Sequence, residues 1–160
     1  MGRSDVGMNS EPVLDREGIH KILPHREPFL LIDEILELEP GRRAVGVKYV
    51  RHDEEYFRGH FPSRPVMPGV LIVESLAQTG ACALLSLDEF RGRIVLFAGI
   101  DKMRFRKPVE PGDSLVLEVT VERIRGPIGK GAAVATVDDD VVADGTLTFA
   151  VSPAGEGGDL

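Results

Sequence analysis

The feature that most constrains the fold is a long apolar segment near the middle of the chain, "PGVLIVESLAQTGACALLSL" (residues 68–87). Glu74 is its only charged residue. Pro68 suits the first turn of a helix, and the Leu and Ala residues that follow favour helical backbone. A helix that is apolar on nearly all sides has to be buried on nearly all sides. The segment therefore predicts one central helix that the rest of the chain surrounds.

The segments after this helix favour strands. Four stretches rich in β-forming residues follow it, separated by short turn-forming sequences, at residues 93–105, 113–124, 131–137 and 141–151. Several strands joined by short turns after one helix indicate an antiparallel sheet packed on that helix, which is an α+β fold. Asp144-Gly145 is a common hairpin signal. Alternation continues through it, however, so we expect it inside or beside the last strand.

The part before the central helix combines a short helix with two strands. "DREGIHKILP" (residues 15–24) suits a short helix that proline stops. "FLLIDEILELEP" (residues 29–40) fits either type of element, whereas "RRAVGVKYV" (residues 42–50) alternates in the manner of a strand. We therefore predict a pair of strands around Gly41.

Size and composition indicate a single globular domain. The chain has 160 residues, of which 42% are hydrophobic and 28% charged. We expect a folded body at residues 13–151, with flexible extensions at 1–12 and 152–160. The net charge, 19 − 26 = −7, argues against general nucleic-acid binding. No uncharged apolar run approaches the length of about 20 residues that a bilayer requires, so we expect no membrane span. One cysteine, Cys82, allows neither an internal disulfide nor a Cys-rich zinc site, so we expect a cytoplasmic protein.

Two ionisable residues stand out, and each has two interpretations. Glu74 lies either on the one solvated stripe of the helix beside Gln78, or it is a proton donor whose pKa is raised by apolar surroundings. His60 is either a loop histidine bonded to backbone or the base that complements such an acid. Residue types alone leave these alternatives open.

The spacing of His60 and Glu74 limits how they can meet. They are 74 − 60 = 14 residues apart, which one helix would stretch to roughly 21 Å. The prolines of "FPSRPVMP" exclude such a helix. The side chains therefore meet only if the loop folds back, or if they belong to two subunits. Gly69 lies at the helix start, where an unpaired N–H group can bind an oxygen that acquires negative charge. A base, an acid and an oxyanion donor indicate elimination next to a carbonyl.

Three sequence blocks carry a resemblance to a known family. "GHFPSRPVMPGVLIVESLAQ" (residues 59–78) resembles the motif of the 3-hydroxyacyl-acyl-carrier-protein dehydratases of FabZ type. Residues 22–41 and 97–113 look like two further blocks of that family, in the same order, so the resemblance covers roughly residues 14–151. It implies a hot-dog fold, in which an antiparallel sheet wraps a long central helix. It also implies a homodimer, commonly assembled as a trimer of dimers, with His60 and Glu74 joined across the dimer interface.

The resemblance assigns the chemistry as well. The substrate is a (3R)-hydroxyacyl thioester on acyl carrier protein, as in fatty acid biosynthesis, and no cofactor is needed. His60 removes the α-proton, the Gly69 N–H group stabilises the enolate-like oxygen, and Glu74, oriented by Gln78, protonates the departing hydroxyl. Related isomerising dehydratases have Asp at the position of Glu74, which favours simple dehydration here.

The chain departs from the family pattern in four places. Ser63 stands where the family often has Gly, and Asp53 where it often has Asn; both are close to the site in sequence. Residues 125–134 ("RGPIGKGAAV") lack an aromatic residue that is common there, and Asp144-Gly145 replaces a more typical strand sequence. None of these departures removes a catalytic group.

Substrate and carrier contacts follow from the same blocks. We expect Phe61, Val70 and Phe97 to line an acyl-chain tunnel. "DKMRFRK" gathers four cations that we expect to dock the acidic carrier protein: Lys102, Arg104, Arg106 and Lys107. Strand alternation predicts that the first three lie on one face, with Met103 and Phe105 on the other.

Other functions fit less well. "HDEEYFRGH" (residues 52–60) matches no familiar metal-ligand spacing, so we predict no metal site. We interpret His25 as structural. A hot-dog thioesterase, which would release free thiol, and a non-catalytic acyl-binding protein remain as alternatives to the dehydratase.

Overall fold

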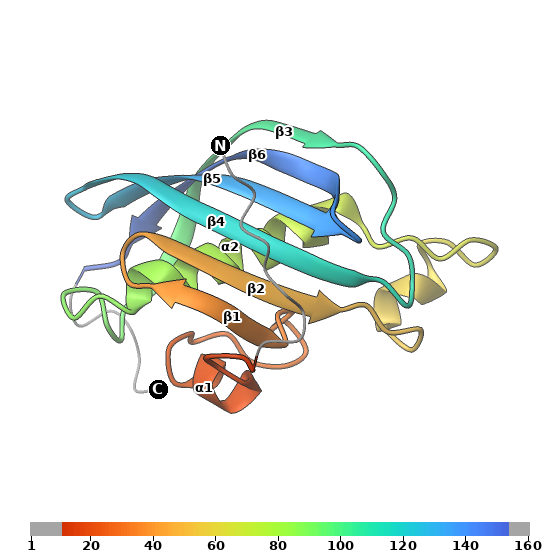
Figure 1. Ribbon diagram of the computed structural model, residues 1–160, viewed down its shortest axis with the longest axis horizontal. Coiled ribbons are helices and arrows are strands. Elements are labelled where there is room, and N and C mark those ends of the chain that lie inside the picture. The colour runs from red at the N-terminus through yellow and green to blue at the C-terminus, as the bar shows by residue number, and fades with distance from the viewer. Residues whose placement is uncertain (1–10, 154–160) are drawn as a thin grey trace.

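A computed structural model describes residues 11–153 of the 160 (Figure 1). The expected flexible ends fall largely outside this range. The elements in chain order are α1 (Arg16–His20), β1 (Glu34–Glu39), β2 (Arg43–Tyr49), the 3-10 helix η1 (Glu55–Arg58), α2 (Gly69–Leu85), β3 (Val95–Phe105), β4 (Ser114–Arg125), β5 (Ile128–Val137) and β6 (Asp140–Val151).

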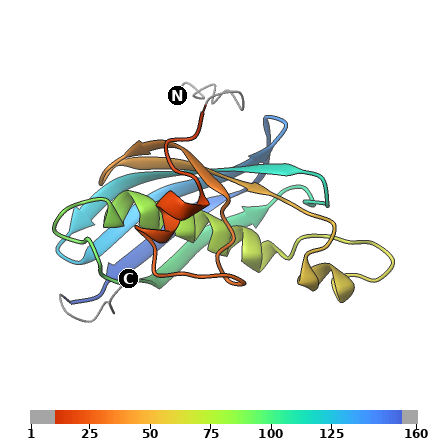
Figure 2. The same cartoon turned by 90° about the horizontal axis from the view of Figure 1, so that it is seen from below.

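The strands form one antiparallel sheet in the order β1-β2-β4-β5-β6-β3. The sheet curves over α2, which runs along its concave face (Figures 1 and 2). The two edge strands are β1 and β3. This is the α+β arrangement expected of a hot-dog fold, and the predicted central helix and the strand pair around Gly41 are confirmed.

The core lies between α2 and the sheet. Every residue of α2 from Ser75 to Leu85 is buried, as the absence of a polar face predicts. Cys82 is among them, and burial raises the pKa of its thiol. Within residues 11–153 no helix is both long and apolar enough to cross a bilayer.

Glycine lets α2 approach the sheet closely. A Cβ atom added at Gly80 would lie 2.8 Å from Cζ of Phe149 and 3.1 Å from Cγ1 of Val119. Both neighbours belong to strands whose inward side chains are fixed by the core. A larger residue at Gly80 would therefore push the helix away from β4 and β6.

Two regions differ from the sequence expectation. Helix α1 ends at His20, short of the predicted residues 15–24. The β4–β5 hairpin extends to the pair Arg125↔Ile128, so only Gly126 and Pro127 form the turn, and the predicted loop at residues 125–131 is wrong. Backbone pairing with β4 and β6 overrides the low strand propensity of the glycines there.

Asp144-Gly145 lies inside β6, as expected from the continued alternation. The hairpin turn lies instead at Asp138 and Asp139, both of which have positive φ. Gly145 faces an irregularity in β3: an added Cβ would lie 2.8 Å from the Cα of Met103. A side chain at position 145 is therefore excluded by the neighbouring backbone.

The close approach at Gly80 gives a stability prediction. We expect Gly80→Ala to lower the free energy of unfolding by about 1–3 kcal/mol, because overpacking outweighs the better helix propensity of Ala. Chemical denaturation measures this change. Gly59→Ala is the matched control, since nothing lies within 4 Å of its added Cβ, and its effect should stay within about 0.5 kcal/mol. A Gly80→Ala chain as stable as the wild type would contradict the packing described.

Candidate active site

His60 lies in the loop between η1 and α2, and its ring is fixed by the backbone. The His60 N–H group donates to the Tyr56 carbonyl over 3.0 Å, and Val66 N–H donates to the His60 carbonyl over 2.9 Å. The Nδ1 atom lies 2.7 Å from the Val66 carbonyl oxygen. Because a carbonyl only accepts, Nδ1 carries the hydrogen and Nε2 keeps its lone pair. The backbone contact and the role of a base, posed above as alternatives, are thus compatible.

A cleft of about 500 Å³ opens beside His60. It is lined by His60, Val66, Met67, Gly69, Val70, Ile72, Phe105, Arg106, Lys107, Pro108 and Val109. His60 and Phe105 are far apart in the sequence. Phe105 is the last residue of β3, and this end of the strand lies beside the start of α2 and His60. The cleft walls are mostly apolar, with polar groups confined to a few positions, as in many small-molecule sites.

Gly69 presents the start of α2 to this cleft. Its N–H group has no hydrogen-bond acceptor among residues 11–153, and the N-cap residue Pro68 supplies no capping side chain. An added Cβ at Gly69 would lie 2.8 Å from Cε1 of Phe105, so glycine lets that ring cover the helix start. The neighbouring Val70 is 74% exposed. An unpaired N–H group at the positive end of a helix is suited to an oxygen that acquires charge.

Glu74 lies one turn further along α2, and Gln78 fixes it. The carboxylate is 17% exposed and accepts a hydrogen bond from Gln78 Nε2 over 3.1 Å. Gln78 is buried; its Nε2 also donates to the Phe29 carbonyl over 2.9 Å, and its Oε1 accepts from Leu31 N–H over 2.8 Å. One conformation of the Gln78 side chain thereby makes three hydrogen bonds. Gln78 therefore holds Glu74 in a defined orientation.

Glu74 does not share a cavity with His60 within one chain. It opens instead on a small cavity of about 30 Å³, lined by His25, Glu74, Ala77, Gln78, Ala81, Val95, Leu96, Phe97 and Phe149. Of the three expected tunnel residues, Val70 lines the His60 cleft and Phe97 the Glu74 cavity. Phe61 lines neither; it stacks on His60 with ring centroids 4.1 Å apart. His60 and Glu74 thus line two separate cavities.

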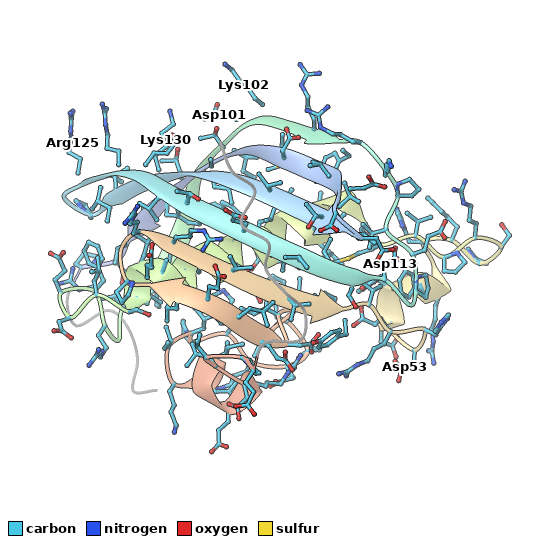
Figure 3. All side chains as sticks on the ribbon, viewed as in Figure 1. Asp53, Asp101, Lys102, Asp113, Arg125 and Lys130 are labelled. Atoms are coloured by element: carbon cyan, nitrogen blue, oxygen red, sulfur yellow. The ribbon has the colours of Figure 1, made fainter. Side chains whose placement is uncertain are left out.

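Of the four expected docking cations, Arg106 and Lys107 line the cleft, whereas Lys102 and Arg104 lie outside its lining. Lys102 has a positive φ, and the β3–β6 register shifts between Asp101 and Arg104. The predicted alternation across Lys102 and Arg104 is therefore wrong, because a β-bulge inserts one residue there. Figure 3 shows Lys102 pointing away from the sheet.

Two of these cations already have carboxylate partners. Arg106 forms two hydrogen bonds with Asp144, of 2.6 and 3.2 Å, and Lys107 lies 2.9 Å from Asp140. Asp144 raises the pKa of Arg106 further. Arg104 is exposed and has no such partner among residues 11–153. The sequence alone gave no sign of these pairs, since about 30 to 40 residues separate the partners.

Sequence reasoning also gave no site role to His25. Its Nε2 atom lies 3.8 Å from Glu74 Oε1, and burial lowers the pKa of the imidazole. The departures Asp53 and Ser63 are both exposed, and Asp53 projects outward beside η1 (Figure 3). No group of three or more potential metal ligands occurs in the described part of the chain.

Comparison with known proteins defines the class. Residues 23–146 match the family model of the FabA-like domain, so the chain belongs to the FabA-like domain family. A curated relative from Roseiflexus sp. (strain RS-1), the 3-hydroxyacyl-acyl-carrier-protein dehydratase FabZ, is 62% identical over 89% of this chain and 100% of its own length. The protein of the same name from Bacillus cytotoxicus is 59% identical over 87% of this chain and 96% of its own length.

Solved structures support the fold. The dehydratase heterocomplex ApeI:P from Xenorhabdus doucetiae contains a chain with a TM-score of 0.73 to this one. The alignment covers 85% of this chain and 91% of that chain, at 15% identity. At that identity the likeness speaks for the shared hot-dog architecture alone.

Proposed function

We propose that this chain dehydrates (3R)-3-hydroxyacyl thioesters on acyl carrier protein to trans-2-enoyl thioesters, the dehydration of fatty acid biosynthesis. The observation that carries the proposal is the identity of 59–62% with FabZ dehydratases over 87–89% of the chain. The groups that we assign to the reaction line two separate cavities, with His60 and Gly69 at one and Glu74 and Gln78 at the other. The reaction moves protons and no net electrons, so no cofactor is required.

The mechanism uses each group once. The His60 Nε2 lone pair removes the α-proton, and the electron pair of that C–H bond becomes part of the new double bond. The Gly69 N–H group stabilises the negative charge on the thioester oxygen. Glu74 gives its proton to the β-hydroxyl, which leaves as water. The hydrogen bond from Gln78 to Glu74 orients the acid for that transfer.

Completion of the site calls for a second copy of the chain. Strand β3 is an edge strand, so its outer backbone groups are free to pair. Exposed large apolar side chains accompany it: Leu96, Phe97, Ile100 and Phe105. A two-fold axis near Asp101 would pair β3 with itself in antiparallel orientation.

Such a pairing also solves the problem of the divided site. Phe97 marks the end of β3 at the Glu74 cavity, and Phe105 marks the end at the His60 cleft. Antiparallel self-pairing places the Phe97 end of β3 in one protomer beside the Phe105 end of β3 in its partner. The His60 cleft of each protomer then faces the Glu74 cavity of the other. We therefore propose a homodimer with two shared active sites, assembled further as a trimer of dimers.

The carrier protein is proposed to dock at the cationic rim of the cleft. Arg106 and Lys107 line the cleft itself, and Arg104 is exposed nearby. Acyl carrier proteins are acidic as a class, so opposite charges attract them to this rim. Charged rim contacts act mainly on association rate and weaken with salt.

The first test removes each proton-transfer group. We expect His60→Ala and Glu74→Gln each to lower the dehydration rate by roughly 10²- to 10⁴-fold, with the fold preserved. The rate is measured by absorbance of the enoyl thioester, and the fold by circular dichroism. His52→Ala is the matched control, because this exposed histidine lines neither cavity. Normal turnover in a folded variant would refute the assignment, and release of free thiol would indicate a thioesterase instead.

The second test addresses the shared site. Mixing His60→Ala chains with Glu74→Gln chains should create heterodimers that hold one intact site each. After equal mixing and full exchange, we expect roughly a quarter of the wild-type activity, since about half the dimers are mixed and each has one of two sites. Native mass spectrometry verifies exchange. Verified heterodimers without recovered activity would place both groups in one chain's site.

The third test concerns docking. Arg104→Glu should raise KM for the carrier-bound substrate several-fold at low salt, and less at high salt, while turnover of a small thioester mimic is unchanged. Arg125→Glu is the matched control, since Arg125 does not line the cleft and lies at the opposite end of β4 from Asp113 (Figure 3). Equal losses on both substrates would mean that Arg104 supports the fold or the site rather than docking.

A further inference from the structure

His25 is the only titratable residue besides Glu74 that lines the small Glu74 cavity. His25 lies in the segment between α1 and β1, and its ring stacks on that of Phe29, with ring centroids 6.3 Å apart. Its Nε2 atom lies 3.8 Å from the same Glu74 oxygen, Oε1, that accepts the Gln78 hydrogen bond. That distance is too long for a hydrogen bond but is closed by a shift of about 1 Å.

The other ring nitrogen indicates which form the imidazole takes. The Nδ1 atom is buried and has no hydrogen-bond partner within residues 11–153. A hydrogen on Nδ1 would therefore be a buried donor without an acceptor, which is costly. The neutral tautomer with its hydrogen on Nε2 avoids this, and it directs that N–H group towards Glu74. An imidazolium ion would place hydrogens on both nitrogens and is disfavoured for the same reason.

The surroundings of the ring also favour a neutral imidazole. Burial lowers the pKa of His25, Glu74 opposes this, and the adjacent Arg26 guanidinium lowers it further. Arg26 itself is held by the carbonyl groups of Leu23, His25 and His20. The remaining residues around the cavity are uncharged. At neutral pH the ring thus offers a hydrogen-bond donor without a positive charge.

We propose that His25 is a positioning residue for Glu74, whose Nε2–H group donates to the carboxylate that forms when Glu74 has given up its proton. Before the proton transfer, His25 and Glu74 form no hydrogen bond. After it, Oε1 of the Glu74 carboxylate accepts from His25 Nε2 as well as from Gln78 Nε2. A neutral donor stabilises the developing carboxylate, so it assists proton release during the reaction. A permanent cation at position 25 would instead favour the ionised carboxylate before substrate binds and so deplete the acid. This inference rests on the proposed function, since it assigns Glu74 the role of acid.

The chain allows a matched set of variants. The amide nitrogen of His25→Gln falls near the original Nε2, whereas the amide of His25→Asn falls near Nδ1; His25→Leu has no donor. We expect His25→Leu and His25→Asn to lower kcat roughly 10- to 100-fold with little change in KM, as for loss of a hydrogen bond to a charged group. His25→Gln should recover most of the rate. His20→Leu is the control, because His20 contacts Glu27 at the surface and lies outside the cavity.

A pH readout separates this role from a structural one. Loss of a donor to the carboxylate makes Glu74 hold its proton to higher pH. The high-pH limb of the kcat profile should therefore move upward in His25→Leu and return in His25→Gln. Equal losses in the Leu, Asn and Gln variants with an unmoved limb would show a packing role and overturn the proposal, as would a kcat within twofold of wild type in His25→Leu.

The inference about His25 can also be tested independently of the proposed function. Carbon-13 NMR follows the titration of the Glu74 side-chain carboxyl in the folded protein without any turnover. An upward shift of its midpoint in His25→Leu supports the contact, and an identical midpoint overturns it. A wild-type chain that dehydrates no hydroxyacyl thioester would refute the proposed function, while the same NMR comparison would still decide whether His25 acts on Glu74.

Discussion

The structure depends on the complete burial of α2. A helix without a polar face gains its stability only when apolar groups surround it, so the rest of the chain is arranged as a sheet that curves around it. Burial on this scale leaves the helix two places for polar chemistry. One is its open N-terminus at Gly69, and the other is the Glu74 side chain with its buried support, Gln78. The two places belong to different cavities because one turn of helix and its apolar side chains separate them.

Gln78 connects this helix to the N-terminal part of the chain. Its amide satisfies both a donor and an acceptor of the segment around Phe29 and Leu31, and the same amide holds Glu74. A buried polar group that is fully hydrogen-bonded fixes a single arrangement more strictly than apolar contacts do. The segment it anchors also carries His25 to the cavity. The anchoring of this segment and the orientation of the Glu74 carboxylate therefore depend on one side chain.

Much of the fold was predictable because its signals are local. The apolar run of residues 68–87 defined the central helix, and alternation defined the strands. The full length of the β4–β5 hairpin was not predicted. Pairing with the neighbouring strands sets this length, and a glycine-rich sequence has no strand pattern from which to predict it. The bulge at Lys102 was missed for a similar reason: it lies beside Gly145 of β6, and the β3 sequence alone does not indicate this neighbour.

The site was predictable to a different degree. Residue types named His60, Gly69 and Glu74 as candidates, and the family motif joined them into one mechanism. Neither source could place His25 near Glu74, since 74 − 25 = 49 residues separate them and only the fold brings them together. The His60 tautomer also needed the structure, because it follows from the Val66 carbonyl beside Nδ1.

For the proposed docking of a carrier protein at the cleft rim, the ion pair between Arg106 and Asp144 affects the affinity. A carrier carboxylate that reaches Arg106 replaces Asp144 rather than meeting a bare charge, so the exchange leaves the number of ion pairs unchanged. Such an exchange adds little net affinity, yet it still rejects surfaces that have no carboxylate to offer. Weak net binding at this position is compatible with release of the carrier after every turnover. Asp144 would thus compete with a carrier carboxylate for Arg106.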